Sequence, residues 1–420
     1  IMKKYRHLHG TLFDIERELR TRNSGVDEAI SEAMVQGNSP PRRQLTREVG
    51  DVFEFENNPA ESEADAAAGR PAAPSSSSAV APAPALAAMK GMEATQKKYP
   101  QRNLNTWMNL IPDDTPLSLI IMPGSHDALV NKEHYKPKKT HMLGRSTPKN
   151  TVCQEVNILG QLERGSRFFD IRLEKNSEGE VLGIHSEGIS DMIGDGGYGQ
   201  SWEEAVKEAV DFLNKFEDQF IIFKVTHVKG ITKFHEVLKN TIKDEEQLEK
   251  RILDLQDTER QNIAQLTYKD LKGKLIVVTD AKEGLESRQK GIHKFVKGNY
   301  EKKVVTRNGL KVYAAFAGTW NIDNIISKAQ EAMDDYAKIE NPKDGIMQIY
   351  WQRTDYRAGV PLIQGNLEEG AKELKKYLHN IKHFHNTRDH SGGIVSYDFV
   401  NEISSEMIIN LNTRIFEQKA

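Results

Sequence analysis

The chain has 420 residues, 38% of them hydrophobic and 28% charged, and its 58 basic and 61 acidic side chains give a net charge of −3. This near neutrality excludes a generally basic nucleic-acid-binding protein, so we expect no nucleic-acid partner. The single cysteine, Cys153, permits no intramolecular disulfide, and no Cys/His group has the spacing of a structural metal site. We therefore expect a reducing compartment, no metal and no cofactor.

The first 95 residues are predicted to lie outside the folded core. Residues 1–50 form an N-terminal arm whose segment Leu8–Arg20 has the apolar spacing of a short amphipathic helix, a candidate docking site for a protein partner. Residues 51–95 are acidic and then rich in Ala, Pro and Ser, too poor in large apolar side chains to offset the entropy of ordering, which predicts a disordered linker. Neither a secretory leader at Ile1–Arg20 nor a run of roughly 18 apolar residues is present, so we expect no signal peptide and no transmembrane segment.

Beyond residue 95, short β-branched runs alternate with longer helical patterns. The strands are predicted at Leu117–Met122, Arg167–Leu173, Val181–His185, Phe220–His227, Leu275–Thr279, Lys311–Ala317, Ile346–Trp351 and Gly393–Tyr397. The helices are predicted at Gln154–Arg164, Ser201–Lys215, Asn321–Ile339, Leu367–His385 and Glu402–Phe416. Such alternation favours parallel pairing, and eight strands favour an α/β fold with a closed (β/α)8 barrel over residues 96–420; an open doubly wound sheet is the alternative.

Polar side chains gather at the ends of the predicted strands. They are His126 and Asp127, Asp170 and Arg172, His185, Lys224 and His227, and Asp398. A lone histidine or aspartate at such a place is most often a hydrogen-bonded structural residue or a helix cap. A convergent set is costly to bury for stability alone, and this one contains an acid/base pair with cations that can stabilise an anion.

Five segments resemble the bacterial-type phosphatidylinositol-specific phospholipases C, enzymes with an X-domain barrel. They are PGSHD at 123–127, QLERGSRFFDIR at 161–172, HS at 185–186, FIIFKV at 220–225 and IVSYDF at 394–399. Their order and spacing are similar over roughly Asn105–Phe416. The resemblance implies an irregular TIM-type barrel that cleaves phosphatidylinositol, giving diacylglycerol and inositol 1,2-cyclic phosphate.

The resemblance also implies roles for three of the residues. His126 would accept the proton of the inositol 2-hydroxyl, and His185 would donate a proton to the departing glycerol oxygen. Asp398 would orient His126. These roles suit the chemistry, because an unactivated hydroxyl needs a neutral imidazole as base and an alkoxide needs a proton donor.

The remaining catalytic assignments concern the phosphate. By the resemblance, Asp127 and Asp170 couple to Arg172 and His185, Arg172 holds a non-bridging phosphate oxygen, and Lys224 reaches phosphate or inositol. A guanidinium among the acids would repel calcium, so we expect a metal-independent reaction, although Asp127, Asp170 and Glu174 offer an oxygen-ligand set in principle.

Other features are assigned less directly. Asp280, Arg353 and Asp355 follow later strands and are candidates to bind the head group, with a solvated ion pair as the alternative for the last two. The segment Asp191–Gly199 does not fit a dinucleotide fingerprint and is predicted to be a mobile lid. The loop Asn131–Asn150 is rich in lysine and is expected to rim the barrel mouth and face an anionic membrane.

Three functions are compatible with this pattern. The first is a phosphatidylinositol-specific phospholipase C that acts as a monomer at a phosphoinositide-containing membrane surface. The second is a degenerate barrel that binds lipid or a protein without turnover, and the third is a phosphodiesterase of the same fold for another head group. We expect a peripheral protein that is either cytoplasmic or delivered into host cells as an effector.

Overall fold

The structure is a computed structural model. It describes residues 102–138, 147–187, 195–231, 237, 241, 245–255, 262–280, 291–298, 309–339, 342–354, 366–385 and 392–417. The predicted N-terminal arm and linker lie outside these residues. Among the described helices, none is long and apolar enough to cross a bilayer.

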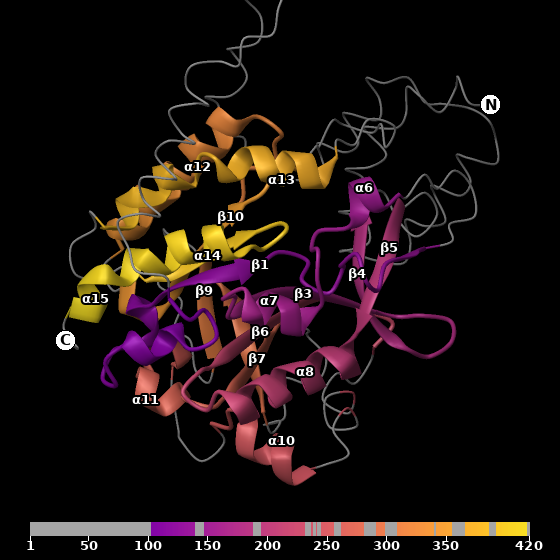
Figure 1. Ribbon diagram of the computed structural model, residues 1–420, viewed down its shortest axis with the longest axis horizontal. Coiled ribbons are helices and arrows are strands. Elements are labelled where there is room, and N and C mark those ends of the chain that lie inside the picture. Colours follow the sequence, from indigo (N-terminus) through magenta and orange to yellow (C-terminus); the bar gives the residue numbers. More distant parts are fainter. Residues whose placement is uncertain are drawn as a thin grey trace, which may run out of the picture. The chain divides into compact units, whose positions relative to one another are not determined.

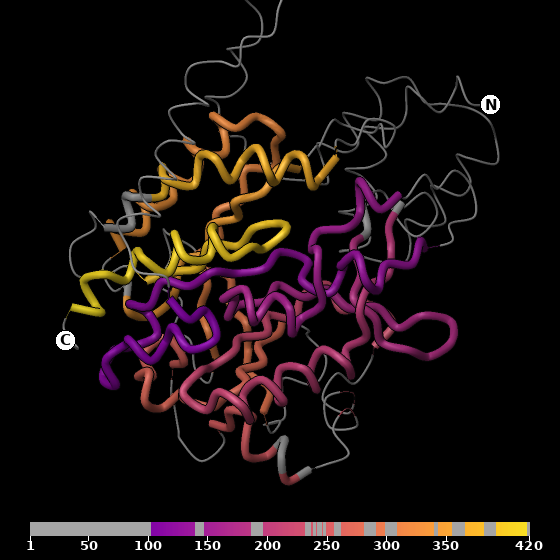
Figure 2. The backbone as a smooth tube through the Cα atoms, in the orientation of Figure 1, coloured from indigo at the N-terminus to yellow at the C-terminus, as the bar shows by residue number. Residues whose placement is uncertain are grey.

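Eight parallel strands close a barrel, as the sequence predicts (Figure 1). They are β1 (Ile121–Ser125), β3 (Phe168–Lys175), β6 (Ile221–Lys229), β7 (Leu275–Thr279), β8 (Ile292–Lys297), β9 (Gly309–Ala315), β10 (Ile346–Trp351) and β11 (Gly393–Tyr397). Closure occurs at β1, which pairs with β11 on one side and with β3 on the other. Figure 2 shows the consequence, with the last strand of the chain beside the first.

The predicted strand Val181–His185 is not part of the barrel. It lies in β4 (Val181–Glu187), which pairs antiparallel with β3 and with β5 (Asp195–Ser201), and the short β2 (Lys136–Pro137) extends this sheet beside the barrel (Figure 1). The link 176–180 is a tight turn in which the Asn176 side chain accepts from two backbone N–H groups. A parallel return needs about a dozen residues, so this turn allows only antiparallel pairing.

The eighth barrel strand is β8, which the sequence analysis missed. Only its first two residues are fully buried, so it lacks the continuous apolar run that marks the other barrel strands. The predicted lid is also partly wrong, because residues 195–199 belong to β5. Gly199 is required there, since a Cβ atom would lie 2.0 Å from the Leu129 carbonyl oxygen.

The predicted helices are present, and several are shorter than expected. The α-helices are α6 (Pro148–Thr151), α7 (Ile158–Glu163), α8 (Trp202–Lys215), α10 (Glu245–Arg251), α11 (Tyr268–Leu271), α12 (Ile322–Ala337), α13 (Leu367–Lys375), α14 (Glu402–Ile409) and α15 (Thr413–Glu417). The 3-10 turns are η1 (Trp107–Leu110), η2 (Leu117–Leu119), η3 (Ile263–Gln265), η4 (Pro342–Asp344), η6 (Leu378–His385) and η7 (Asn410–Asn412). Ser201, Asn321, Asn366 and Asn401 cap the helices that follow them.

The core has an inner and an outer part. Phe168, Ile222 and Ile394 belong to a buried cluster that also contains Trp107 of η1, before β1, and Tyr268 of α11, before β7. Their neighbours in sequence, such as Phe169 and Phe223, pack instead with the residues of α7 and α8. A second outer cluster joins β10 and β11 to α12 and η6. Alternate residues of each strand therefore face the barrel interior and the helices.

Candidate active site

Polar side chains fill the barrel interior towards the carboxyl ends of the strands. On β3, Phe168 belongs to the inner cluster, so Asp170 and Arg172, two and four residues later, face the same side. The same alternation turns other polar residues inward; these are Lys224 on β6, Gln348 and Tyr350 on β10, and Ser396 on β11. The barrel interior thus has an apolar layer towards the amino ends of the strands and a polar layer towards their carboxyl ends.

His126 and Asp398 directly follow two adjacent strands and contact each other. β1 and β11 pair with Ser125 opposite Tyr397, which places the next residue of each strand side by side. Nδ1 of His126 lies 2.8 Å from Oδ1 of Asp398, and both side chains are buried. A carboxylate at Nδ1 favours the tautomer that carries its proton there. Nε2 of His126 is then the ring nitrogen that can accept a proton.

Lys375 on α13 is half-buried near Asp398 and donates to the carbonyl oxygen of Phe399. Burial lowers the pKa of Lys375 to about 8 from its ordinary 10.5, although Asp398 acts in the opposite direction. Between these pH values the unfolded chain binds more protons than the folded chain, so stability rises with pH. We expect the free energy of unfolding to rise by about 2–3 kcal/mol from pH 8 to pH 10.5. Urea denaturation of wild type and Lys375→Met at both pH values tests this, and an equal rise in the two proteins would contradict it.

Asp127 connects the two histidines to the arginine. It adopts a φ of 41°, in the left-handed region that aspartate tolerates better than most residues. Its Oδ1 lies 2.8 Å from Nε of Arg172, and its Oδ2 lies 3.4 Å from Nδ1 of His185 and 3.6 Å from Nε2 of His126. Burial acts to raise the pKa of Asp127, but Arg172 and the histidines together hold the pKa below its ordinary value. Asp127 is therefore an anion.

Arg172 is the most exposed member of this group. Its side chain is 27% exposed, and Nη2 lies 3.4 Å from Nε2 of His126. Burial acts against its charge, but Asp127 and Asp170 raise the pKa of Arg172 above its ordinary value. A permanently charged, partly exposed guanidinium is thus placed next to Nε2 of His126.

Lys224 and Asp170 share a buried network with Tyr350. The Lys224 ammonium donates to the Tyr350 hydroxyl at 2.6 Å and to Gln348 at 3.1 Å, and it lies 3.4 Å from Oδ1 of Asp170. The Tyr350 hydroxyl donates to Oδ2 of Asp170 at 2.9 Å. Burial lowers the pKa of Lys224, which Asp170 partly opposes. This network fixes a cation and a carboxylate on the floor of the site.

Two residues of the site were missed by the sequence analysis. Tyr350 could have been found, because Ile346, Gln348 and Tyr350 occupy alternate positions of one strand. Cys153 carries no such signal, because it lies in the irregular segment between α6 and α7. Its sulfur lies 3.0 Å from Nδ1 of His185, in the middle of the predicted catalytic residues.

The predicted head-group residues have different surroundings. Asp280 follows β7, and although the residue is exposed as a whole, partial loss of solvent around its carboxyl raises its pKa, while His227 and Lys224 act to lower it. Arg353 is bound by Glu373 of α13 at 2.7 Å and lies over the Trp320 ring. Its guanidinium is therefore held by structural partners. Asp355 lies outside the described residues.

The oxygen-ligand set considered for calcium does not converge. Glu174 is bound by the Lys138 ammonium at 2.7 Å and by the Tyr198 hydroxyl at 2.8 Å. In the described part of the chain, two other groups bring three potential metal ligands together: His126, Cys153 and Asp398, and Asp127, Cys153 and His185. Both include the thiol, so they favour soft or borderline metals over calcium.

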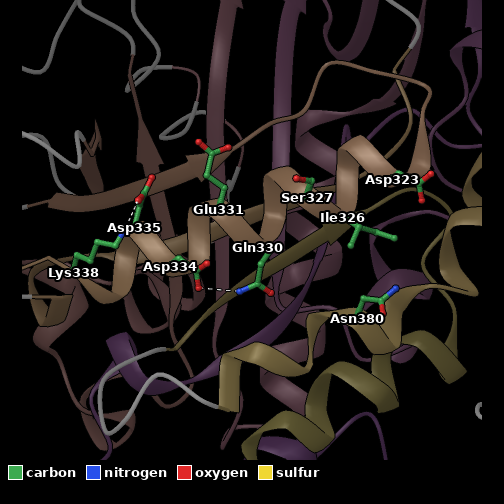
Figure 3. Close-up of a pocket in the computed structure, with 9 residues that line it drawn as sticks. All are labelled: Asp323, Ile326, Ser327, Gln330, Glu331, Asp334, Asp335, Lys338 and Asn380. Carbon is green, nitrogen blue, oxygen red and sulfur yellow. Dashed lines mark hydrogen bonds and ion pairs between the residues drawn. The ribbon is translucent and has the colours of Figure 1, made fainter. Parts of the chain in front are cut away.

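A groove runs along α12 outside this site (Figure 3). It is lined by residues of α12 and by Asn380 of η6: Asp323, Ile326, Ser327, Gln330, Glu331, Asp334, Asp335 and Lys338. Gln330 bonds to Asp334 and Lys338 pairs with Asp335. None of the predicted catalytic residues lines this groove, and we assign it no function.

Comparison with known proteins finds similarity to proteins that contain a PI-PLC X domain. The PI-PLC X domain-containing protein 1 of Mus musculus is 24% identical over 170 residues, which cover 35% of this chain and 47% of the mouse protein. Its Homo sapiens counterpart is 27% identical over 164 residues, or 34% of this chain and 49% of the human protein. The matches span about half the length of these relatives. No family model matches the sequence.

The barrel itself is shared with a bacterial enzyme. A phosphatidylinositol-specific phospholipase C of Staphylococcus aureus superposes with a TM-score of 0.51 and 16% sequence identity, covering 74% of this chain and 98% of that one. This chain has the fold of the bacterial phosphatidylinositol-specific phospholipases C. The predicted resemblance is thereby confirmed for the fold.

Proposed function

We propose that the chain is a metal-independent phosphatidylinositol-specific phospholipase C. The observation that carries this proposal is the arrangement of two buried histidines, each beside a carboxylate, with Arg172 next to one of them. Two imidazoles provide a base and an acid, and the guanidinium provides a site for a phosphate oxygen. A lipid-binding barrel without turnover has no need of this combination.

The reaction would proceed by intramolecular displacement. Nε2 of His126 takes the proton of the inositol 2-hydroxyl as its oxygen attacks phosphorus. The bond from phosphorus to the glycerol oxygen then breaks, and His185 donates a proton to that oxygen. The products are diacylglycerol and inositol 1,2-cyclic phosphate, and Asp398 stabilises the positive charge that His126 acquires.

Arg172 and Asp127 would stabilise two charges in the reaction, the negative charge on the phosphate and the positive charge on His185. Arg172 binds a non-bridging oxygen, whose negative charge grows in the transition state. Asp127 holds Arg172 through Oδ1 and stabilises the protonated form of His185 through Oδ2, 3.4 Å away. Asp170 contributes through Lys224 and Tyr350, so it orients the floor of the site.

Head-group binding is assigned to the Lys224 network and to Asp280. The buried Lys224 ammonium suits a sugar hydroxyl or a phosphate oxygen, and Asp280 suits sugar hydroxyls. Arg353 and Asp355 were predicted for the same task. We give Arg353 a positioning role at most, because Glu373 already neutralises it.

The proposed substrate requires contact with a membrane surface. Two lysines of the predicted basic loop are already paired, Lys132 with Glu368 and Lys138 with Glu174, so the loop attracts anionic lipid less than its composition indicates. We propose a peripheral association; the cytoplasmic or effector location stays a prediction.

The decisive measurement is head-group release in the presence of a chelator. We expect the chain to release cyclic inositol phosphate from phosphatidylinositol vesicles, and to do so undiminished in excess EDTA, because Arg172 supplies the positive charge at phosphate. Vesicles of phosphorylated inositides and glycosylated anchors, tested in parallel, separate this function from a phosphodiesterase for another head group. Activity that is lost with EDTA and restored by calcium would contradict the metal-independent reaction. Binding of all the vesicles without release would favour the degenerate barrel.

A further inference from the structure

The only cysteine of the chain lies in the candidate active site. Cys153 is fully buried, and its sulfur lies 3.0 Å from Nδ1 of His185. Asp127 approaches the same ring nitrogen, with Oδ2 at 3.4 Å. The ligand atoms of the three residues all lie within 4.8 Å of one another. We call Asp127, Cys153 and His185 the Cys153 cluster.

The carboxylate of this cluster lacks hydrogen bonds. Asp127 is 1% exposed, and neither of its oxygens accepts a hydrogen bond from the described residues. Arg172 pairs with Oδ1 at 2.8 Å, while Oδ2 lies 3.4 Å from Nδ1 of His185 and 3.6 Å from Nε2 of His126 and accepts no hydrogen bond from the described residues. Arg172 balances the charge of the carboxylate, but Oδ2 still lacks a partner, and either a proton on Nδ1 of His185 or a metal ion would supply one.

The separations of the three ligand atoms are close to those found around zinc. Zn²⁺ binds sulfur at about 2.3 Å and nitrogen or oxygen at about 2.0–2.2 Å in a tetrahedron, so its nitrogen and oxygen ligands lie roughly 3.4 Å apart. The Nδ1 to Oδ2 distance of 3.4 Å fits this value, and the sulfur needs to move outward by about half an ångström. Thiolate, imidazole and carboxylate are all ligands of zinc.

We propose that the Cys153 cluster is an inhibitory binding site for Zn²⁺. The ion binds the Cys153 thiolate, Nδ1 of His185 and Oδ2 of Asp127, with solvent or a phosphate oxygen as the fourth ligand. Binding releases the thiol proton and any proton on Nδ1 to solvent, so affinity rises with pH. Arg172 repels a hard cation such as calcium, which would be bound by oxygen atoms alone. Zinc is bound in spite of Arg172, because the Cys153 thiolate adds a negative charge and a soft ligand that zinc accepts.

The inhibitory effect rests on the proposed function. His185 can act as the acid only as an imidazolium, and a metal ion on Nδ1 removes that form. Zinc therefore competes with the Nδ1 proton that makes the His185 ring an imidazolium. This is the opposite of a zinc enzyme, since a chelator is expected to restore activity.

The test uses cobalt as a spectroscopic substitute for zinc and needs no substrate. With one cysteine in the chain, a near-ultraviolet band from thiolate to Co²⁺ can arise only at Cys153. We expect wild type to bind one equivalent of Co²⁺ with this band and to lose it when one equivalent of Zn²⁺ is added. Cys153→Ser and His185→Gln should each weaken Co²⁺ binding by more than the roughly 10- to 100-fold that loss of an outer partner costs.

The control is His134→Gln, which removes a histidine that pairs with Glu204 outside the cluster. It should leave the band and the affinity unchanged, and thermal melts should show every variant folded. Absence of the band in wild type would overturn the proposal without any variant. A band that persists in His185→Gln at the Co²⁺ affinity of wild type would overturn it as well.

A second measurement separates this proposal from the function on which its inhibition rests. Stoichiometric Zn²⁺ should lower phosphatidylinositol cleavage by wild type at least tenfold, and EDTA should reverse this. The cleavage rate of each variant with zinc is compared with its own rate without zinc. Zn²⁺ should not lower the cleavage rate of Cys153→Ser. A wild type that shows the band but cleaves no phosphatidylinositol refutes the phospholipase and leaves the zinc site in place. A wild type that cleaves lipid but gives no band refutes the zinc site alone.

Discussion

Replacing either His126 or His185 with alanine is expected to lower the turnover of phosphatidylinositol by ~10²-fold or more. Each imidazole would transfer a proton only in the transition state, so the loss should appear in kcat. Thermal melts must show both variants folded. We expect both variants to fold, because neither histidine belongs to the apolar clusters of the core.

The two variants should respond differently to an activated substrate. The nitrophenyl ester of inositol phosphate has a leaving group that departs without protonation, so it bypasses the acid and still requires the base. His185→Ala should be substantially rescued on this ester, whereas His126→Ala stays inactive. Wild type should show a bell-shaped pH profile on the natural lipid, which reports the two groups as a pair.

Equal losses for both variants on the activated ester would refute the assignment of base and acid. Full activity of both variants on phosphatidylinositol would refute catalysis at this site and leave the lipid-binding barrel as the better account. A matched control is His379→Ala, since His379 bonds to a backbone carbonyl of its own segment and is not among the predicted catalytic residues.

Replacing Arg167 with methionine is expected to destabilise the barrel by about 3–5 kcal/mol. Arg167 is fully buried at the start of β3, and burial lowers its pKa to about 9. Its guanidinium donates to the Gln219 side chain and to four backbone carbonyl groups, those of Leu104, Asn105, Leu162 and Ser166. These bonds join β3 to the segment that precedes η1. Methionine has similar length and no donors, so buried carbonyl oxygens would be left without partners.

The matched control is Arg164→Met, three residues before Arg167 in the chain. It removes a partly exposed ion pair with Glu155 and one hydrogen bond to the Val400 carbonyl oxygen. Such pairs contribute about 0–1 kcal/mol, so urea denaturation should show a far smaller loss than for Arg167→Met. Similar losses for the two variants would mean that the carbonyl groups around Arg167 are satisfied in another way.

The barrel and half of the candidate site could be predicted from the sequence. Mostly apolar runs of five to eight residues indicated seven of the eight barrel strands, because strands buried on both faces are largely apolar. The first predicted run, Leu117–Met122, shares only Ile121 and Met122 with β1, since Leu117–Leu119 form η2. The same pattern located Asp170 and Arg172 on one face, since side chains two apart on a strand point the same way. His126 and Asp398 were recognisable because each follows such a strand directly.

The tertiary structure decided how these residues meet. Closure of β1 on β11 joins His126 to Asp398 across 272 positions of sequence, and no local pattern encodes such a pairing. His185 arrives on an antiparallel hairpin because the turn before it is too short for a crossover, which the apolar run of its strand could not reveal. Cys153 lies in irregular chain, where no periodicity fixes the direction of a side chain. Its contact with His185, and hence the proposed zinc site, follows only from the way the barrel brings distant segments together.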